Sequence, residues 1–135
     1  MRQTFKGELV TQWSQDREKQ FAEENGINPV KGASLPGLGK DILHYGGNSG
    51  YQAINLAYLR GATHIYLIGY NMGAGGNTHF FGDHSGGLVS GNYAGFVEQF
   101  DRLSQDLAEE GVTVINCTPD TALYQFPIGK LREVL

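Results

Sequence analysis

The sequence predicts an α/β domain, a Rossmann-like three-layer fold with a mainly parallel central sheet. Apolar, β-branched runs alternate with helical segments along the chain, which is typical of strand–helix–strand units. Right-handed crossovers place such strands parallel in one sheet with helices on both faces. The 20 glycines exceed the average usage of about 7% and gather between these segments, where loops are expected. At this length we expect residues 1–135 to form a single domain.

The first part of the chain predicts a short strand, a helix and a second short strand. Residues 8–12 form the first strand, and Ser14 is expected to cap a helix that runs to Glu24 and stops at Gly26. Residues 27–30 read as a strand that Pro29 interrupts. The next ten residues, to position 40, predict a loop.

The middle of the chain shows a clearer pattern. Residues 42–45 are a β-run, residues 46–50 a glycine turn, and residues 51–60 a helix that ends at Gly61. The run over residues 64–70 is apolar without polar alternation, which predicts a central strand covered on both faces.

The last part of the chain begins with a long loop over residues 71–91, at a length typical of functional loops. A helix is expected over residues 93–110, because Phe96, Phe100, Leu103 and Leu107 share one face. A buried strand over residues 112–117 follows it. Further predictions are a helical turn within residues 121–126 and a closing segment over residues 128–135.

Composition excludes several classes of partner. The net charge of −4 and the sequence pI near 5.5 provide no basic surface, so we expect neither nucleic acid nor membrane as partner. The single cysteine, Cys117, cannot form an internal disulfide and reads as a buried strand residue. The amino-terminal residues lack the apolar core of a signal peptide, so a cytoplasmic location is expected.

In an open parallel sheet, ligands bind beyond the carboxyl ends of the strands. His64 begins its strand and therefore falls at the opposite end, where a structural role is expected. The candidate ligand-binding residues all follow predicted strands: Gly47, Asn48, Ser49, Gly50, Gly69, Tyr70, Asn71, Asn116 and Thr118.

The turn Gly46-Gly47-Asn48-Ser49-Gly50 opens a helix. Its free amides, the Ser49 hydroxyl and the helix dipole suit a phosphate or carboxylate. The turn is neither a Walker loop nor a full dinucleotide fingerprint, and glycine also serves tight turns for steric reasons alone. Both interpretations stay open.

The loop segment over residues 77–85 holds His79, Asp83 and His84, which are suited to general base chemistry or to metal binding. Their spacing resembles no zinc signature, so we predict no metal and no cofactor. The alternative is a loop packed by hydrogen-bonded histidines. Ser49 lacks the nucleophile-elbow pattern, and a buried Cys117 lacks the exposure of a reactive thiolate.

Four segments together resemble phage and prophage proteins of unknown function. The same order is similar to the carboxyl-terminal part of the Rossmann-like catalytic domain of bacterial lipooligosaccharide sialyltransferases. The resemblance covers about the last two-thirds of the chain. The segments are Gly-Gly-Asn-Ser-Gly-Tyr-Gln-Ala from Gly46, Ile-Tyr-Leu-Ile-Gly-Tyr-Asn from Ile65, Thr-His-Phe-Phe-Gly-Asp-His from Thr78, and Val-Ile-Asn-Cys-Thr-Pro from Val114.

The resemblance implies a mechanism. Ser49 would contact a CMP-sugar donor, and His84 would deprotonate an acceptor hydroxyl while CMP leaves. Where the transferases carry tyrosines that support the leaving phosphate, this sequence has Gly73 and His79. His79 is therefore a second catalytic candidate.

The family's first strand–helix unit, which holds the nucleotide, would lie before Met1. Without it, sheet edge and apolar surface would be uncovered, so we expect a homo-oligomer, and specifically a dimer. Two functional hypotheses follow. The first is a nucleotide or nucleotide-sugar binding protein with sialyltransferase-like catalysis if active. The second is a non-catalytic module for protein interaction, assembly or sequestering a small nucleotide.

Overall fold

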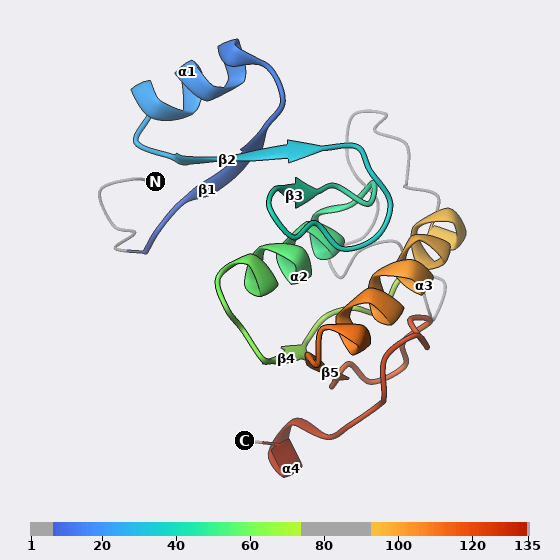
Figure 1. Cartoon of the computed structure of the whole chain (residues 1–135). Coiled ribbons are helices and arrows are strands. Elements are labelled where there is room, and N and C mark those ends of the chain that lie inside the picture. The colour runs from blue at the N-terminus through green and yellow to red at the C-terminus, as the bar shows by residue number, and fades with distance from the viewer. Residues whose placement is uncertain (1–6, 74–92, 135) are drawn as a thin grey trace.

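The computed structural model describes residues 7–73 and 93–134 (Figure 1). Most of the loop predicted over residues 71–91 lies outside this part, and so do the catalytic candidates His79 and His84. In chain order the elements are β1 (Val10–Trp13), α1 (Asp16–Glu24), β2 (Asn28–Ala33), β3 (Leu43–His44), α2 (Ser49–Leu59), β4 (His64–Leu67), α3 (Tyr93–Glu109), β5 (Thr113–Asn116) and α4 (Leu131–Val134).

The strands pair in parallel, which confirms the predicted α/β class of Rossmann-like type. In the first sheet, of order β1-β2-β3, Val10 pairs with Asn28, and Gly32 with Leu43. In the second, β4 pairs with β5 from His64↔Thr113 to Leu67↔Asn116.

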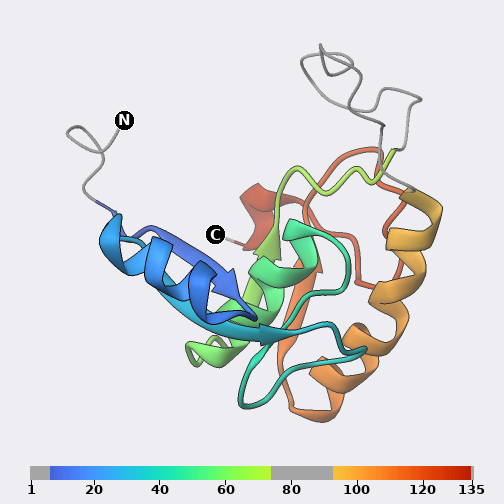
Figure 2. The same ribbon diagram turned by 90° about the horizontal axis from the view of Figure 1, so that it is seen from above.

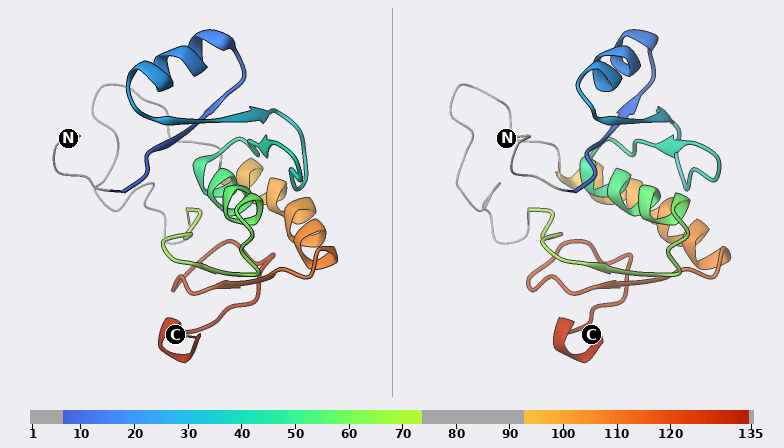
Figure 3. Two further views of the ribbon diagram at one scale, coloured as in Figure 1. Left: turned by 60° about the vertical axis from the view of Figure 1, so that its left-hand side comes forward. Right: turned by 90° about the vertical axis from the view of Figure 1, so that its left-hand side faces the viewer.

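The expectation that all strands join in one sheet differs from the structure. Within the described residues the hydrogen bonds form two separate sheets. Figure 3 shows α2 and α3 between the β1–β3 layer and the β4–β5 layer. The reason is the placement of α2, which packs against β3 while its Tyr51 and Ile54 join a core with Leu67 of β4. Because the helix fills the space between β3 and β4, these two strands do not pair.

Several predicted element bounds also need correction. Ser14 does not cap α1, because the helix begins at Asp16 after the N-cap residue Gln15. The Ser14 and Gln15 amides instead donate to the Glu18 carboxylate, at 2.8 and 3.1 Å. Strand β2 continues through Pro29 to Ala33, into the predicted loop, because Gly32 and Ala33 pair with β3.

Strand β4 is shorter and less covered than predicted. It ends at Leu67, and Ile68 is 62% exposed. Its one strand partner among the described residues is β5, so the other edge of β4 is unpaired there. Residues 121–126 form turns and bends with no helix, whereas the segment beyond residue 128 contains α4.

The main core lies between the two central helices and the second sheet (Figure 2). Phe100, Leu103 and Leu107 of α3 are fully buried, as their predicted helical spacing indicated. Cys117 is buried immediately after β5. Other core residues are Leu38, Tyr51, Ile54, Leu67, Val114, Leu123 and Phe126. In the part of the chain that the structure describes, no helix is long and apolar enough to cross a membrane.

Candidate functional site

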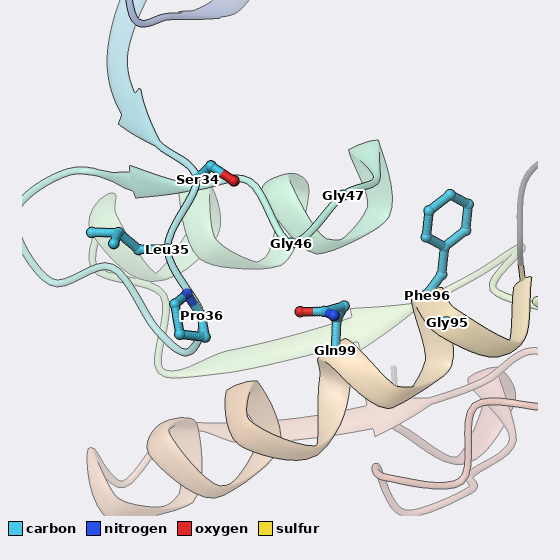
Figure 4. Close-up of a pocket in the computed structure, with 8 residues that line it drawn as sticks. All are labelled: Ser34, Leu35, Pro36, Gly46, Gly47, Gly95, Phe96 and Gln99. Carbon is cyan, nitrogen blue, oxygen red and sulfur yellow. The ribbon is translucent and has the colours of Figure 1, made fainter.

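A hollow of about 410 Å³ lies beyond the carboxyl ends of β2 and β3 (Figure 4). Its position fits the rule that parallel strands place ligand sites past their carboxyl ends. One wall is the loop after β2, another the turn after β3, and the third the first turns of α3. The lining residues are Ser34, Leu35, Pro36, Gly46, Gly47, Gly95, Phe96 and Gln99.

The turn between β3 and α2 has a backbone that favours glycine. Gly46 and Gly47 have φ of +52° and +73°, in the left-handed region. A Cβ on Gly46 would lie 2.0 Å from the Tyr51 ring, so the turn wraps closely around that side chain. A side chain at position 46 would therefore clash with Tyr51, which agrees with the interpretation that glycine serves this tight turn for steric reasons.

The same turn presents unpaired donors. Asn48 caps α2 by accepting a hydrogen bond of 2.8 Å from the Tyr51 amide. The amides of Gly47, Ser49 and Gly50 make no hydrogen bond to any described residue. Unpaired amides at a helix N-terminus, together with the helix dipole, favour a negatively charged group.

The loop wall of the hollow is fixed by α2 and by β3. The Tyr51 phenol donates to the Gly37 carbonyl at 2.6 Å. The His44 ring Nδ1 lies 3.1 Å from the Pro36 carbonyl and 3.0 Å from that of Gly37. Burial, with a smaller contribution from the Asp106 carboxylate, raises the pKa of Tyr51 to about 12, so the phenol stays a donor at neutral pH.

The rest of this loop is held by buried or charged groups. Asn55, which is fully buried, accepts from the Gly39 and His44 amides at 3.0 and 2.9 Å and donates to the Gly39 carbonyl at 2.8 Å. Asp106 of α3 accepts from the Leu38 amide at 2.9 Å. These bonds keep Ser34–Pro36 facing the Gly46–Gly47 turn.

The residues predicted after β4 and β5 come together in a second arrangement. The Tyr70 amide donates to the Thr118 hydroxyl at 2.9 Å, and its phenol donates to the Gly50 carbonyl at 3.0 Å. The Asn71 carbonyl accepts from the Ala122 amide at 2.9 Å. Burial raises the pKa of Tyr70. The loop after β4 therefore bonds to the first turn of α2, and the loop after β5 bonds to the loop after β4.

Asn116 has a structural position within this arrangement. It is fully buried at the end of β5, accepts from the Thr118 amide at 3.0 Å and donates to the Thr121 hydroxyl at 3.1 Å. Gly69, with φ of +83°, is exposed at the bend after β4. The hydrogen bonds of Asn116 shape the loop after β5, and the backbone angle of Gly69 shapes the bend after β4.

The turn predicted as one site borders two different hollows. Gly46 and Gly47 line the hollow of Figure 4, whereas the exposed Ser49 lines a separate cavity between α2 and β1. Gly50 lies toward Tyr70, since a Cβ there would be 2.9 Å from the Tyr70 ring. The structure thus brings Gly50, Tyr70 and Thr118 together but directs Ser49 elsewhere.

Sequence reasoning missed part of the lining. Ser34, Leu35 and Pro36 fell in a segment predicted as a loop without function, and Gln99 received no role. Phe96 was predicted as a core residue of α3, yet it borders the hollow one turn before the buried Phe100. The signal available for Ser34–Pro36 was their position after a strand, since β2 ends at Ala33.

The described residues that line the hollow carry no charged side chain, so the chemistry they offer is that of backbone amides, one hydroxyl and one carboxamide. Among the described residues, no three His, Cys, Asp or Glu side chains converge as they would around a metal ion. Comparisons with protein-family models, with curated proteins and with solved structures each give no significant match.

Proposed function

We propose that the chain binds a nucleotide or nucleotide sugar in the hollow of Figure 4, with a phosphate at the Gly46–Gly47 turn. The observation that carries the proposal is the position of this hollow. It lies past the carboxyl ends of two parallel strands and is closed by a turn whose Gly47 amide is unpaired among the described residues. A phosphate held by amides and a helix dipole needs no lysine.

The other lining residues suit the remainder of such a ligand. Leu35 and Pro36 provide an apolar wall, and the Ser34 hydroxyl and the Gln99 carboxamide offer donors and acceptors to a base or sugar. The Gln99 side chain makes no hydrogen bond to any described residue. In Figure 4 it extends from α3 toward the space between the two loops.

Sialyltransferase-like transfer is the catalytic form of this proposal. His84 would take the proton of an acceptor hydroxyl as the acceptor oxygen bonds to the anomeric carbon of the sugar. The bond between the sugar and the CMP phosphate would break, and CMP would leave with His79 near its phosphate. Both histidines lie outside the described residues, so the support for this step is the resemblance alone. Binding and turnover are therefore tested separately.

The binding experiment follows the thermal midpoint during titration with CMP, CMP-sialic acid and other nucleotides. A ligand that binds the folded state raises the midpoint with concentration. Gln99→Trp would fill the hollow from a helical position and is expected to abolish the shift. Glu98→Trp is the matched control, because Glu98 is the exposed neighbour on α3 and does not line the hollow.

Two outcomes would contradict the proposal. One is the absence of a shift with any nucleotide at millimolar concentration. The other is a shift that Gln99→Trp leaves intact. If binding is found, His84→Ala and His79→Ala in a turnover assay with CMP-sialic acid separate a transferase from a protein that binds without catalysis.

A non-catalytic assembly module is the second candidate function, and the exposed apolar residues beside the second sheet favour it. Ile68 and Ile128 are 62% and 60% exposed. The edge of β4 away from β5 has no strand partner among the described residues, and such edges tend to pair with another chain. A dimer in light-scattering measurements that Ile68→Glu converts to monomer would support this candidate.

A further inference from the structure

A second cavity lies between α2 and the first sheet. It measures about 260 Å³ and forms because α2 packs closely against β3, whereas β1 stands farther from the helix. Its apolar floor includes Leu43 of β3 and Leu56 of α2. It shares no lining residue with the hollow of Figure 4, so what it binds does not depend on the nucleotide site.

The polar groups of this cavity come from two elements. Thr11 and Gln12 belong to β1, and Ser49 and Gln52 to α2. The Ser49 and Gln52 side chains make no hydrogen bond to any described residue. The Ser49 hydroxyl and the carboxamides of Gln12 and Gln52 thus lie around an apolar floor, and no described residue of the lining carries a charged side chain.

Gln12 carries an unusual polar atom. Its Oε1 is buried and has no hydrogen-bond partner among the described residues. Buried acceptors in folded proteins are almost always paired, because an unpaired one destabilises the fold. The last torsion of a glutamine side chain is soft, so the Gln12 carboxamide can rotate to meet the donor of a ligand.

Gln12 and Thr11 also border a hollow on the α1 side of the strand, with Arg17, Glu18 and Phe21. There the Glu18 carboxylate already accepts from Ser14 and Gln15. The α2 side offers Ser49 and Gln52 with unused hydrogen-bonding capacity. Side chains alternate along a strand, and the Trp13 ring lies beneath Lys19 of α1, so the neighbouring Gln12 side chain points toward the α2 side of β1.

We propose that the cavity between β1 and α2 binds an uncharged sugar ring. Such a ligand donates and accepts through its hydroxyls, which match the carboxamides of Gln12 and Gln52 and the hydroxyl of Ser49. Its C–H surface packs on Leu43 and Leu56. A charged ligand is disfavoured, because the described lining residues offer no opposite charge to replace its hydration.

The test uses two-dimensional NMR of the ¹⁵N-labelled chain during titration with methyl β-D-galactopyranoside and methyl α-D-glucopyranoside. Saturable shifts are expected at the amides of Thr11, Gln12, Ser49 and Gln52. Glucuronate supplies a ring of similar size with a negative charge, and it is expected to bind at least tenfold more weakly. CMP in a separate titration reports on the Gly46–Gly47 hollow, which keeps the two sites distinguishable.

Gln12→Leu and Gln52→Leu are each expected to weaken sugar binding at least tenfold. The thermal midpoint of Gln12→Leu should stay equal or rise, because the change removes an unpaired buried acceptor; a purely structural glutamine would lower it. Ser49→Ala at an exposed position tests the same contact without risk to the core. Gln20→Leu on exposed α1 is the control and should bind as wild type. Non-saturable shifts, shifts equal to those with glycerol, or binding unchanged in the variants would overturn the proposal.

Discussion

The phenol of Tyr51 donates a hydrogen bond of 2.6 Å to the carbonyl of Gly37, and so joins helix α2 to the loop that forms a wall of the candidate site. The Tyr51 ring is fully buried and packs against Phe100 of α3, with ring centroids 5.4 Å apart. The Tyr51 side chain therefore contacts both the core and the loop of the candidate site. Changes at Tyr51 should affect both the stability of the fold and the geometry of the hollow.

Tyr51→Phe is expected to lower the free energy of unfolding by about 1 kcal/mol, the usual net value of a neutral hydrogen bond. The ring contact with Phe100 is kept, so the loss isolates the hydroxyl. Urea unfolding monitored by circular dichroism measures it. Tyr124→Phe is the control, because Tyr124 is 78% exposed and should change the free energy by a few tenths of a kcal/mol at most.

Alkaline pH should weaken the same bond. The pKa of Tyr51 is raised from 10.0 to about 12 in the folded state, chiefly by burial. The stabilisation is therefore complete below pH 10, and it is lost as pH rises through about 12. Unfolding midpoints measured between pH 9 and pH 12 should fall more steeply for the wild type than for Tyr51→Phe; parallel curves would contradict the assignment.

Gly46→Ala tests the tight turn. Gly46 has φ of +52°, and a Cβ there would lie 2.0 Å from the Tyr51 ring. The expected loss in the free energy of unfolding is about 2 kcal/mol or more, since backbone strain of about 1–2 kcal/mol adds to the overlap. Gly61→Ala is the matched control: its φ is +85°, and nothing lies within 4 Å of the added Cβ. Equal losses in the two variants would show that the Tyr51 ring moves aside without cost.

Much of the fold could be predicted from local patterns. The face of α3 with Phe100, Leu103 and Leu107 is buried as its spacing predicted, and Gly61 and Gly111 follow their helices. The class and the parallel pairing also follow from strand–helix alternation. Such features depend on residues close in sequence, whose periodicity is visible without the fold.

The separation into two sheets could not be predicted in this way. It depends on where α2 packs, and that follows from Tyr51 and Ile54 meeting Leu67 and Phe100 from distant segments. The arrangement of the candidate site also depends on contacts between segments that are distant in sequence. Ser49 and Gly47 border different cavities. Which way each residue faces at the start of α2 depends on how the helix packs, and a turn motif in the sequence does not specify it.

Glu8 offers a test of the contact between the residues before β1 and the end of α2. Hydrogen bonds from Arg60 and Asn28 lower the pKa of Glu8 from 4.5 to about 2. Arg60 follows α2, so this ion pair joins the helix end to the residues before β1. We expect carbon-detected NMR titration to give a Glu8 pKa well below 4.5 in the wild type and closer to 4.5 in Arg60→Gln.

The direction of the pH effect follows from that shift. Because the folded pKa is depressed, the pair stabilises the fold above pH 4.5, and the contribution is lost as pH falls toward about 2. Lys19→Gln is a suitable control, since Lys19 pairs with Glu23 within α1 and does not contact Glu8. An unchanged Glu8 pKa in Arg60→Gln would mean that the pair does not form in solution.

Asn55 is expected to be the most sensitive polar residue of the wall. Its carboxamide serves the Gly39 and His44 amides and the Gly39 carbonyl from a fully buried position. Asn55→Ala leaves these three backbone groups unpaired, and each unpaired buried group costs about 1–3 kcal/mol. The free energy of unfolding should therefore fall by about 3 kcal/mol or more in urea titration. Asn25→Ala removes one exposed bond to the Phe21 carbonyl and should cost about 1 kcal/mol or less. Similar losses in the two variants would contradict the buried network, because water would then be replacing the Asn55 bonds.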